Sequence, residues 1–292
     1  MHLTEKAYGK LNLALDVLAK RPDGYHDMRM IMQSVDLYDT VDLELDTGKP
    51  WQLDCYREVD GQRFRESYPQ DERNLAWRAA DAFCNALGRR PDGLAMTIIK
   101  RIPVQAGMAG GSADAAAVLR GLNRAYGEPF DTEALCRIGA QVGSDVPYCV
   151  MNGTALAQGR GEILTPLRPI PPVWFVLCKP DFAVSTPELF RAIDGETIRS
   201  RPDVDGMLQA IESGDAAGIG MRMENVFQPV ASARFPVVDE ICAILRSCNA
   251  LGAQMTGTGS VVFGMYGTEA DAKQAMAAVQ THIKEVFLVK PV

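Results

Sequence analysis

Residues 100–123 read KRIPVQAGMAGGSADAAAVLRGLN and place glycines directly before a helical pattern. The stretch LAMTIIKRIP predicts a strand ending at Pro103, and apolar spacing predicts a helix from about Ser112 to Tyr126. Glycine exposes bare backbone N–H groups, and the start of a helix adds N–H groups that lack intrahelical partners. A strand, glycine loop and helix in this order are typical of a phosphate site. The alternative is a plain turn with Ser112 as an ordinary N-cap.

This glycine loop, residues 103–113, follows neither common nucleotide-binding pattern. No Gly-Lys-Ser or Gly-Lys-Thr follows the glycines, which excludes a Walker A loop. No clean G-x-G-x-x-G and no acidic ribose-binding residue after a parallel strand support a dinucleotide site. A phosphate loop of a third kind must take its lysine from elsewhere. Residues 6–18 alternate like a half-buried strand, and we expect Lys10 and Asn12 on its open face.

Composition indicates a globular protein without a nucleic-acid surface. The chain has 292 residues, of which 47% are hydrophobic and 23% charged, enough for one large domain or two ordinary ones. The formal net charge is -7 and no Lys/Arg-rich run occurs, which argues against nucleic-acid partners. The N-terminal residues lack a signal-peptide pattern and the apolar runs are only strand-sized. We therefore expect a cytoplasmic protein without a membrane partner.

The cysteines and histidines indicate reduced thiols rather than a metal site. Seven cysteines occur without a CxxC pair or an even framework, so we expect mostly buried, reduced thiols. Only three histidines occur and none are closely paired, which makes a zinc site improbable.

The rest of the chain predicts two domains. Residues 40–46 and 51–56 alternate across the turn signal at residues 47–50 and predict a hairpin, and residues 57–73 read as a loop. GSDVPYCV predicts a tight loop entering a strand. Gly- and Pro-rich residues near 159–172 suggest a boundary between domains 1–160 and 161–292. Without its extra helices, the second half has the β-α-β-β-α-β order of a ferredoxin-like fold.

Several motifs together resemble the GHMP small-molecule kinases. PVQAGMAGGSADAA is similar to their phosphate-binding loop. The family's N-terminal motif resembles AYGKLNLALDVLAKRPDGYHDM, and its later motifs resemble, in the same order along the chain, GSDVPYCV, GRGEILTPL and MTGTGSVVFG. The resemblance runs from residue 7 to about 264. It implies an α+β, two-domain GHMP kinase fold, with an N-terminal ribosomal-protein-S5-domain-2-like ATP-binding domain and a C-terminal ferredoxin-like domain. The chain departs from the family at Tyr8-Gly9, Met108 and Ala113, and we assign Ala113 no polar contact.

The Arg-Pro-Asp-Gly-Tyr-His piece resembles the member of this family that handles a cytidine-bearing alcohol. It implies ATP-dependent phosphorylation of the 2-hydroxyl of 4-diphosphocytidyl-2-C-methyl-D-erythritol, in isoprenoid synthesis by the non-mevalonate route. ATP is the implied cofactor, Mg²⁺ is expected with it, and the sequence announces no metal ligands. Three alternatives stay open: a GHMP kinase of another alcohol, a non-catalytic nucleotide-binding regulator, and a decarboxylase of the same superfamily.

The resemblance also implies roles for individual residues. Asp145 matches the catalytic aspartate and Lys10 the lysine that pairs with it. Backbone groups of the glycine loop would hold the triphosphate, at Pro103, Val104, Gln105, Ala106, Gly107, Met108, Ala109, Gly110, Gly111, Ser112 and Ala113.

The remaining implied residues would bind the substrate. Tyr25 and His26 follow the turn-forming Pro-Asp-Gly and would stack on cytosine and hydrogen-bond its edge. Phe190 would lie on the opposite face of the base, although a helix-core role is nearly as well supported. Asn12 would bind a substrate hydroxyl or phosphate, and the backbone at Gly257 and Gly259 would line the substrate side or simply form a turn.

Overall fold

The computed structural model describes residues 1–59, 61–65, 68–195 and 198–292. The chain forms two compact units from interleaved segments. Unit 1 comprises residues 1–9, 37–103 and 109–152, and unit 2 comprises residues 10–36, 104–108 and 153–292. The long strands β1 (His2–Lys20) and β2 (His26–Leu45) contribute to both units. Because the units interleave, the division predicted after residue 160 stays a prediction.

The strands of unit 1 surround β5 (Leu94–Lys100). Residues 40–45 of β2 pair with β5 in antiparallel fashion, and β3 (Gln52–Val59) pairs with it in parallel. The predicted hairpin between residues 40–46 and 51–56 is therefore wrong, because the strongly apolar β5 lies between β2 and β3. Residues 57–73 are not a continuous loop either, since β3 forms a hairpin with β4 (Gln62–Arg65). Exposed β4 is held by backbone pairing and carries no apolar signal.

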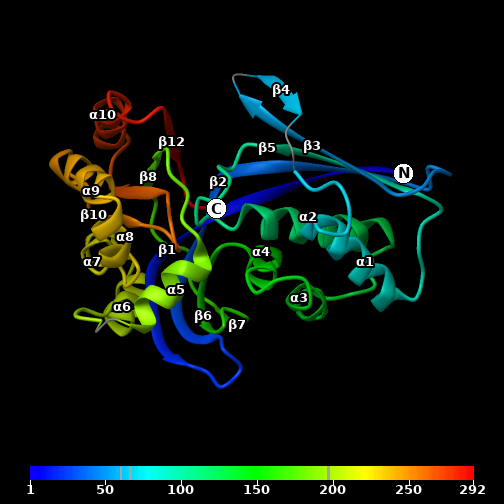
Figure 1. Cartoon of the computed structure of the whole chain (residues 1–292), viewed down its shortest axis with the longest axis horizontal. Helices are drawn as coiled ribbons and strands as arrows, with labels where there is room; N and C mark the ends of the chain where they lie inside the picture. The colour runs from blue at the N-terminus through cyan, green and yellow to red at the C-terminus, as the bar shows by residue number, and fades with distance from the viewer. Residues whose placement is uncertain (60, 66–67, 196–197) are drawn as a thin grey trace. The chain divides into compact units, whose positions relative to one another are not determined.

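Four helices of unit 1 lie along one side of these strands (Figure 1): α1 (Leu75–Leu87), α2 (Gly110–Ala125), α3 (Thr132–Ala140) and α4 (Val146–Met151). Asp131 caps α3, because its side chain accepts a hydrogen bond from the Ala134 amide. Residues 146–151 form a helix rather than the predicted loop and strand. Their apolar, β-branched run is too short to show helical periodicity, and the proline sits in the first turn, where a helix tolerates it.

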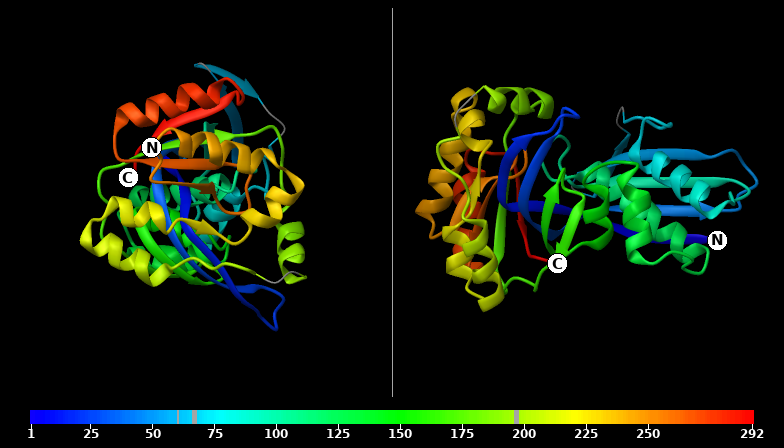
Figure 2. Two further views of the ribbon diagram at one scale, coloured as in Figure 1. Left: turned by 90° about the vertical axis from the view of Figure 1, so that its left-hand side faces the viewer. Right: turned by 90° about the horizontal axis from the view of Figure 1, so that it is seen from below.

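Unit 2 contains a four-stranded antiparallel sheet in the order β12-β8-β11-β10. Its strands are β8 (Trp174–Lys179), β10 (Gly252–Met255), β11 (Val262–Tyr266) and β12 (Glu285–Val289). Helices α9 (Val237–Ser247) and α10 (Glu269–Gln280) cover one face of it (Figure 2). This order confirms the predicted ferredoxin-like arrangement.

The other elements of unit 2 lie outside this four-stranded sheet. They are β6 (Thr154–Gly159), β7 (Ile163–Pro166), α5 (Thr186–Asp194), α6 (Val204–Ser213), α7 (Ala216–Met221), β9 (Glu224–Asn225) and α8 (Gln228–Arg234). β6 pairs with residues 28–33 of β2, and β9 pairs in parallel with Ala14 and Leu15 of β1.

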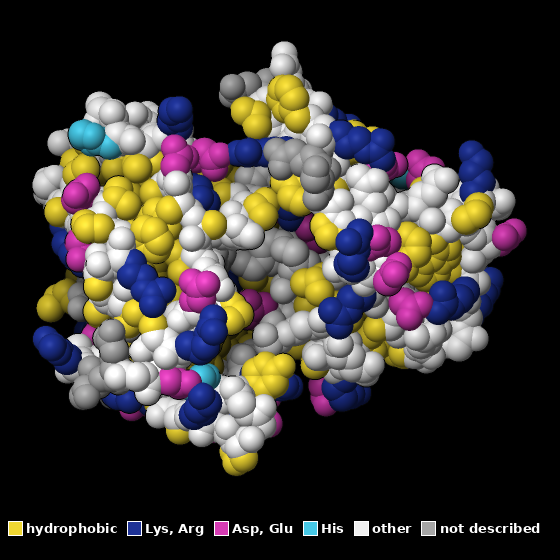
Figure 3. All heavy atoms as spheres, in the orientation of Figure 1, with side chains coloured by type: hydrophobic (Ala, Val, Ile, Leu, Met, Phe, Trp, Pro, Cys, Tyr) yellow, Lys and Arg dark blue, Asp and Glu magenta, His cyan; other side chains and the backbone are white. Residues whose placement is uncertain are grey.

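The thiols and the surface agree with the composition. All seven cysteines are free, and every one except Cys136 is buried. Lys and Arg side chains alternate with Asp and Glu over the face drawn in Figure 3, without a large basic field. Within the described ranges, no helix is both long and apolar enough to cross a bilayer.

Candidate functional site

The helix after the glycine loop begins earlier than predicted. Its first residue is Gly110, and Ala109 occupies the N-cap position with a left-handed φ of 57° and no side-chain cap. The alternative of Ser112 as an ordinary N-cap is therefore wrong, because the left-handed Ala109 lets the helix start two positions before the predicted Ser112. The amides of Gly110, Gly111 and Ser112 open the helix, where N–H groups lack intrahelical acceptors. This uncapped start supplies the donors that an anion requires.

The middle of the glycine loop belongs to unit 2 and packs on residues 256–261. Gly107 has φ 73°, and a Cβ there would lie 2.3 Å from the carbonyl oxygen of Thr256, so only glycine fits. The amide of Val261 donates to the Ala106 carbonyl at 3.3 Å. A Cβ on Gly257 would lie 2.8 Å from the Gly107 carbonyl oxygen. The predicted ATP loop and the predicted substrate loop are thus in direct contact here.

Lys10 and Asn12 lie beside this junction. The Lys10 amide donates to the Met108 carbonyl at 3.1 Å, and its Nζ donates to Asn12 Oδ1 at 2.6 Å. The Asn12 amide donates to Thr256 Oγ1 at 3.0 Å. Both side chains are buried, with exposed fractions of 5% and 0%. The prediction of an open strand face is wrong, because Gln254 and Thr256 of unit 2 bond to the strand at this point.

Asp145 belongs to unit 1, whereas Lys10 belongs to unit 2. The aspartate directly precedes α4, is half-buried, and makes no side-chain hydrogen bond that caps the helix. The Asp145 carboxylate therefore does not cap α4. A purely structural capping role, which would compete with a catalytic one, is not observed. Its pairing with Lys10 stays a prediction.

Tyr25 and His26 follow a turn, as predicted. Gly24 has φ 86°, and Asp23 accepts the Tyr25 amide at 3.1 Å. The Tyr25 side chain is 57% exposed, with the guanidinium of Arg160 5.0 Å from its ring centroid. One face of the tyrosine is thus covered by a cation, and the other face is the one that remains for a base.

His26 is only 8% exposed and is held on two sides. Its Nε2 lies 2.6 Å from Asp194 Oδ1, and its ring centroid lies 4.9 Å from that of Phe190 at 30°. Phe190 also makes an edge contact with Phe227 at 4.8 Å. The structure therefore brings together His26 and Phe190, two of the predicted substrate residues. A direct contact of Phe190 with a base stays a prediction.

Sequence reasoning missed three side chains that hold these residues. Thr256 fixes Asn12, Asp194 fixes His26, and Asp114 lies buried in α2 with Lys100. A polar signal existed only for Asp114, which interrupts an alanine-rich run. The other two gain their partners from segments remote in sequence.

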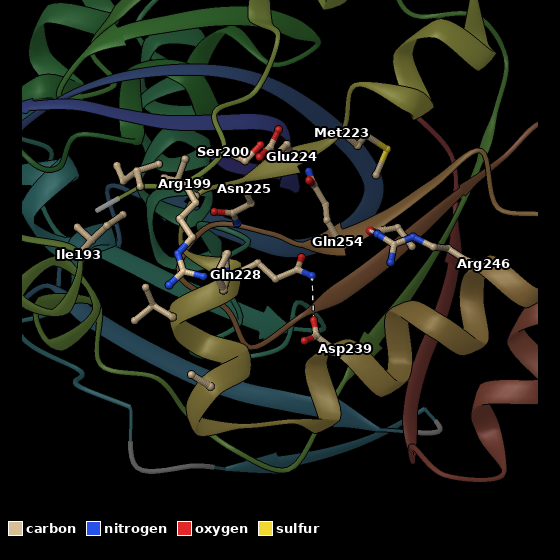
Figure 4. A pocket seen from close by; sticks show the side chains of 16 residues that line it. Ile193, Arg199, Ser200, Met223, Glu224, Asn225, Gln228, Asp239, Arg246 and Gln254 are labelled. Atoms are coloured by element: carbon tan, nitrogen blue, oxygen red, sulfur yellow. Dashed lines mark hydrogen bonds between the residues drawn. The ribbon is translucent and has the colours of Figure 1, made fainter. Parts of the chain in front are cut away.

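Unit 2 also contains a cavity of about 580 Å³ between β9, β10, α8 and α9 (Figure 4). None of the predicted site residues lines it. Gln254, on its wall, donates through Nε2 to the carbonyls of Asn12 and Leu13 at 2.8 and 3.0 Å. The cavity thus borders the strand that carries Asn12 without including the candidate site itself.

The described residues contain no group of three or more His, Cys, Asp or Glu side chains placed to hold a metal ion. A Mg²⁺ that arrives with a nucleotide takes phosphate and water oxygens with only one or two carboxylates. The residues present are therefore compatible with a nucleotide-borne ion and name no ligands for it.

Comparison with known proteins identifies the family. Residues 74–153 match the family described as GHMP kinases N terminal domain, and residues 207–285 match GHMP kinases C terminal. A 4-diphosphocytidyl-2-C-methyl-D-erythritol kinase of Geobacillus thermodenitrificans is 42% identical over 290 residues, covering 99% of this chain and 97% of the relative. The kinase of the same name from Caldicellulosiruptor saccharolyticus is 40% identical over 283 residues, with coverages of 97% and 94%.

Solved structures agree with this assignment. A crystal structure of 4-(cytidine 5'-diphospho)-2C-methyl-D-erythritol kinase superimposes with a TM-score of 0.81 at 30% identity, covering 99% of each chain. A homoserine kinase of Cytophaga hutchinsonii has a TM-score of 0.78 at 17% identity, covering 100% of this chain and 94% of that one, and shares the fold. The chain is therefore an enzyme that belongs to the 4-diphosphocytidyl-2-C-methyl-D-erythritol kinase family of the GHMP kinases.

Proposed function

We propose that the protein transfers the γ-phosphoryl group of ATP to the 2-hydroxyl of 4-diphosphocytidyl-2-C-methyl-D-erythritol, as the names of its relatives suggest. The observation that supports this proposal most is a junction in unit 2. There Lys10 and Asn12 are bonded to Thr256 and to the middle of the glycine loop at Met108. A cation and an amide side chain on one strand, bonded to a phosphate-type loop, are the parts that phosphoryl transfer needs.

The glycine loop would bind the triphosphate. Backbone N–H groups at the uncapped start of α2 point from a helix N-terminus, where the helix dipole favours negative charge. Glycine at position 107 allows the loop to approach residues 256–259 closely. This would leave nucleotide and acceptor alcohol next to each other, and positioning is the larger part of catalysis in this reaction class.

Asp145 would orient the acceptor hydroxyl and take its proton. A carboxylate is a weak base for an alcohol, so it accepts the proton only as the phosphorus–oxygen bond forms and the hydroxyl becomes acidic. Lys10 would supply positive charge to the same centre. Its ammonium group is held by Asn12 in a buried position, where electrostatic interactions are stronger than in water.

Tyr25 and His26 would recognise the cytidine end of the substrate. With Nε2–H donated to Asp194, the His26 ring leaves Nδ1 as an acceptor, which suits the amino group of cytosine. Tyr25 offers an exposed ring for stacking, worth about 1–3 kcal/mol per base. A substrate without cytosine would gain neither interaction.

ATP would bring Mg²⁺, which neutralises charge on the phosphates when it is bound. We further propose a small molecule as the sole type of partner and the cytoplasm as the location. The seven free cysteines and the net charge of -7 without a basic run support these two points.

The experiment that tests the substrate is a comparison of alcohols. ADP formation is measured with 4-diphosphocytidyl-2-C-methyl-D-erythritol, mevalonate and homoserine, each at saturating ATP. The proposal expects turnover above the ATP-only rate with the cytidine substrate alone. Turnover only with mevalonate or homoserine would keep the kinase and reject the cytidine assignment. ATP binding without any turnover would favour the regulator.

A further inference from the structure

A cluster of three charged side chains lies buried in unit 1 beneath the start of α2. Lys100, at the end of β5, donates through Nζ to Asp114 Oδ2 at 2.5 Å and also to Asp39 Oδ2. The side chains of Lys100, Asp39 and Asp114 are 9%, 0% and 6% exposed. A Cβ on Gly110, the first residue of α2, would lie 3.5 Å from Lys100 Nζ. This charge cluster, Asp39, Lys100 and Asp114, therefore supports the end of the glycine loop directly.

Asp39 is fully occupied within the cluster. Besides the ammonium group, it accepts the amides of Arg101 and Ile102 at its Oδ1, at 2.5 and 2.8 Å. These bonds fix the chain just before Pro103, where the glycine loop begins. Asp39 thus has a structural task that requires its acceptor oxygens.

Asp114 differs, because its second oxygen is unused. Oδ1 is buried and makes no hydrogen bond with a described residue. Two carboxylates share one ammonium group, so ionisation of both leaves one uncompensated negative charge in a buried place. Burial, with Asp39 adding to it and Lys100 opposing it, raises the pKa of Asp114 to about 8.

Lys100 and Cys55 also face Asp114, and the pKa of each is raised. Burial lowers the pKa of Lys100, but Asp114 and Asp39 more than offset this and raise it, so the ammonium persists. From β3, the Cys55 thiol faces the cluster, and burial raises its pKa to about 11. Of Asp114, Lys100 and Cys55, the group whose pKa lies between pH 7 and 9 is Asp114.

We propose that Asp114 is a positioning residue that sets the charge beneath the ATP phosphates: its protonated form leaves the cluster neutral and admits the anionic nucleotide, and its ionised form opposes binding. The inference rests on the proposed role of the glycine loop. Its consequence is that ATP binding near pH 8 takes up a proton, because the nucleotide favours the protonated cluster. The phosphates of ATP do not supply this proton dependence, since phosphate groups ionise near pH 6.

The test measures the dissociation constant of ATP by calorimetry at pH 7, 8 and 9. We compare the wild type, Asp114→Asn, which keeps the shape without the charge, and Asp92→Asn, which removes an exposed carboxylate of unit 1. Full coupling to a group of pKa about 8 gives a tenfold increase in Kd from pH 7 to 9. We expect a three- to tenfold increase for wild type and Asp92→Asn, and less than about twofold for Asp114→Asn.

Equal pH slopes in all three proteins would overturn the inference while leaving the ATP site in place. If Asp114→Asn does not fold, proton uptake by the wild type on ATP binding tests the inference. Calorimetry at pH 8 in two buffers of different ionisation enthalpy gives the protons taken up, and zero uptake overturns the inference. Failure of the wild type to bind ATP at pH 7 would instead reject the proposed nucleotide site.

Discussion

The imidazole Nε2 of His26 lies 2.6 Å from Oδ1 of Asp194, so a carboxylate of α5 fixes the ring that follows the Pro-Asp-Gly turn. Bonds to Lys20 and to His26 hold the pKa of Asp194 below its usual range. Asp194 therefore remains an anion and an acceptor at neutral pH, and His26 donates to it through Nε2–H. The arrangement determines which ring nitrogen is left for a ligand.

Replacement of Asp194 by Asn tests this relationship. The neutral amide weakens a charge-assisted hydrogen bond by about half and no longer selects one orientation of the ring. We expect KM for the cytidine substrate to rise about three- to tenfold, with kcat within about twofold. Steady-state kinetics at saturating ATP measure both. Asp181→Asn, at an exposed position of unit 2, is the control. A fall in kcat with KM unchanged would assign Asp194 to another task.

Gly107→Ala tests the close approach of the glycine loop to residue 256. A left-handed backbone costs a non-glycine residue about 1–3 kcal/mol, and the added Cβ would also meet the Thr256 carbonyl at 2.3 Å. Gly214→Ala is a matched control, because Gly214 has φ 70° with nothing within 4 Å of the added carbon. Urea unfolding should show a larger loss in the free energy of unfolding for Gly107→Ala than for Gly214→Ala, and Gly107→Ala should also bind ATP more weakly. Equal losses of unfolding free energy in the two variants would mean that the close approach of Gly107 to the Thr256 carbonyl does not contribute to stability.

Thr256→Val tests the support of Asn12. The valine removes the oxygen that accepts the buried Asn12 amide, and a buried unpaired donor costs about 1–3 kcal/mol. We expect a loss of that size in the free energy of unfolding and a lower kcat, since Asn12 holds Lys10. Thr256→Ser keeps the hydroxyl and should restore both quantities. Loss of activity in the serine variant too would show that the methyl group matters instead.

The raised pKa of Asp114 also predicts how the free energy of unfolding depends on pH. Its folded pKa is raised to about 8 from 3.8, so the folded state holds a proton that the unfolded state releases between these values. Its contribution to stability is fully present below pH 3.8 and is lost as pH rises to 8. The stability of Asp114→Asn relative to wild type should therefore increase with pH, by at most about 1.4 kcal/mol per unit, and level off above pH 8. Urea unfolding at pH 5, 6, 7 and 8 measures the difference, and a constant difference would contradict the account.

Much of the fold was predictable because its elements carry local signals. Helix α1 lies between an Asn74 cap and the left-handed Gly88, and Thr268 before α10 accepts the Asp271 amide. The sheet of unit 2 followed from strand order alone. The hairpin across residues 47–50 failed because the pairing partner β5 arrives some forty residues later, and no local pattern announces it.

The site was predictable only in part, for a related reason. The motifs name Lys10, His26 and the glycine loop, but side-chain partners come from remote segments. Asp194 is 168 positions from His26, and Thr256 is 244 from Asn12. Lys10 Nζ is held by Asn12, and the contact that fixes Asn12 comes from this remote segment, which strand alternation does not report.

The most direct test of the proposed chemistry is single-turnover transfer from γ-labelled ATP to 4-diphosphocytidyl-2-C-methyl-D-erythritol by wild type and Asp145→Asn. A group that orients and deprotonates the acceptor contributes about 10²–10⁴-fold to the rate. We predict a loss of at least 100-fold, with the Kd of ATP within about threefold of wild type and with Asp92→Asn unaffected. Transfer by Asp145→Asn at a rate comparable to wild type would contradict the assignment of Asp145 as the catalytic residue.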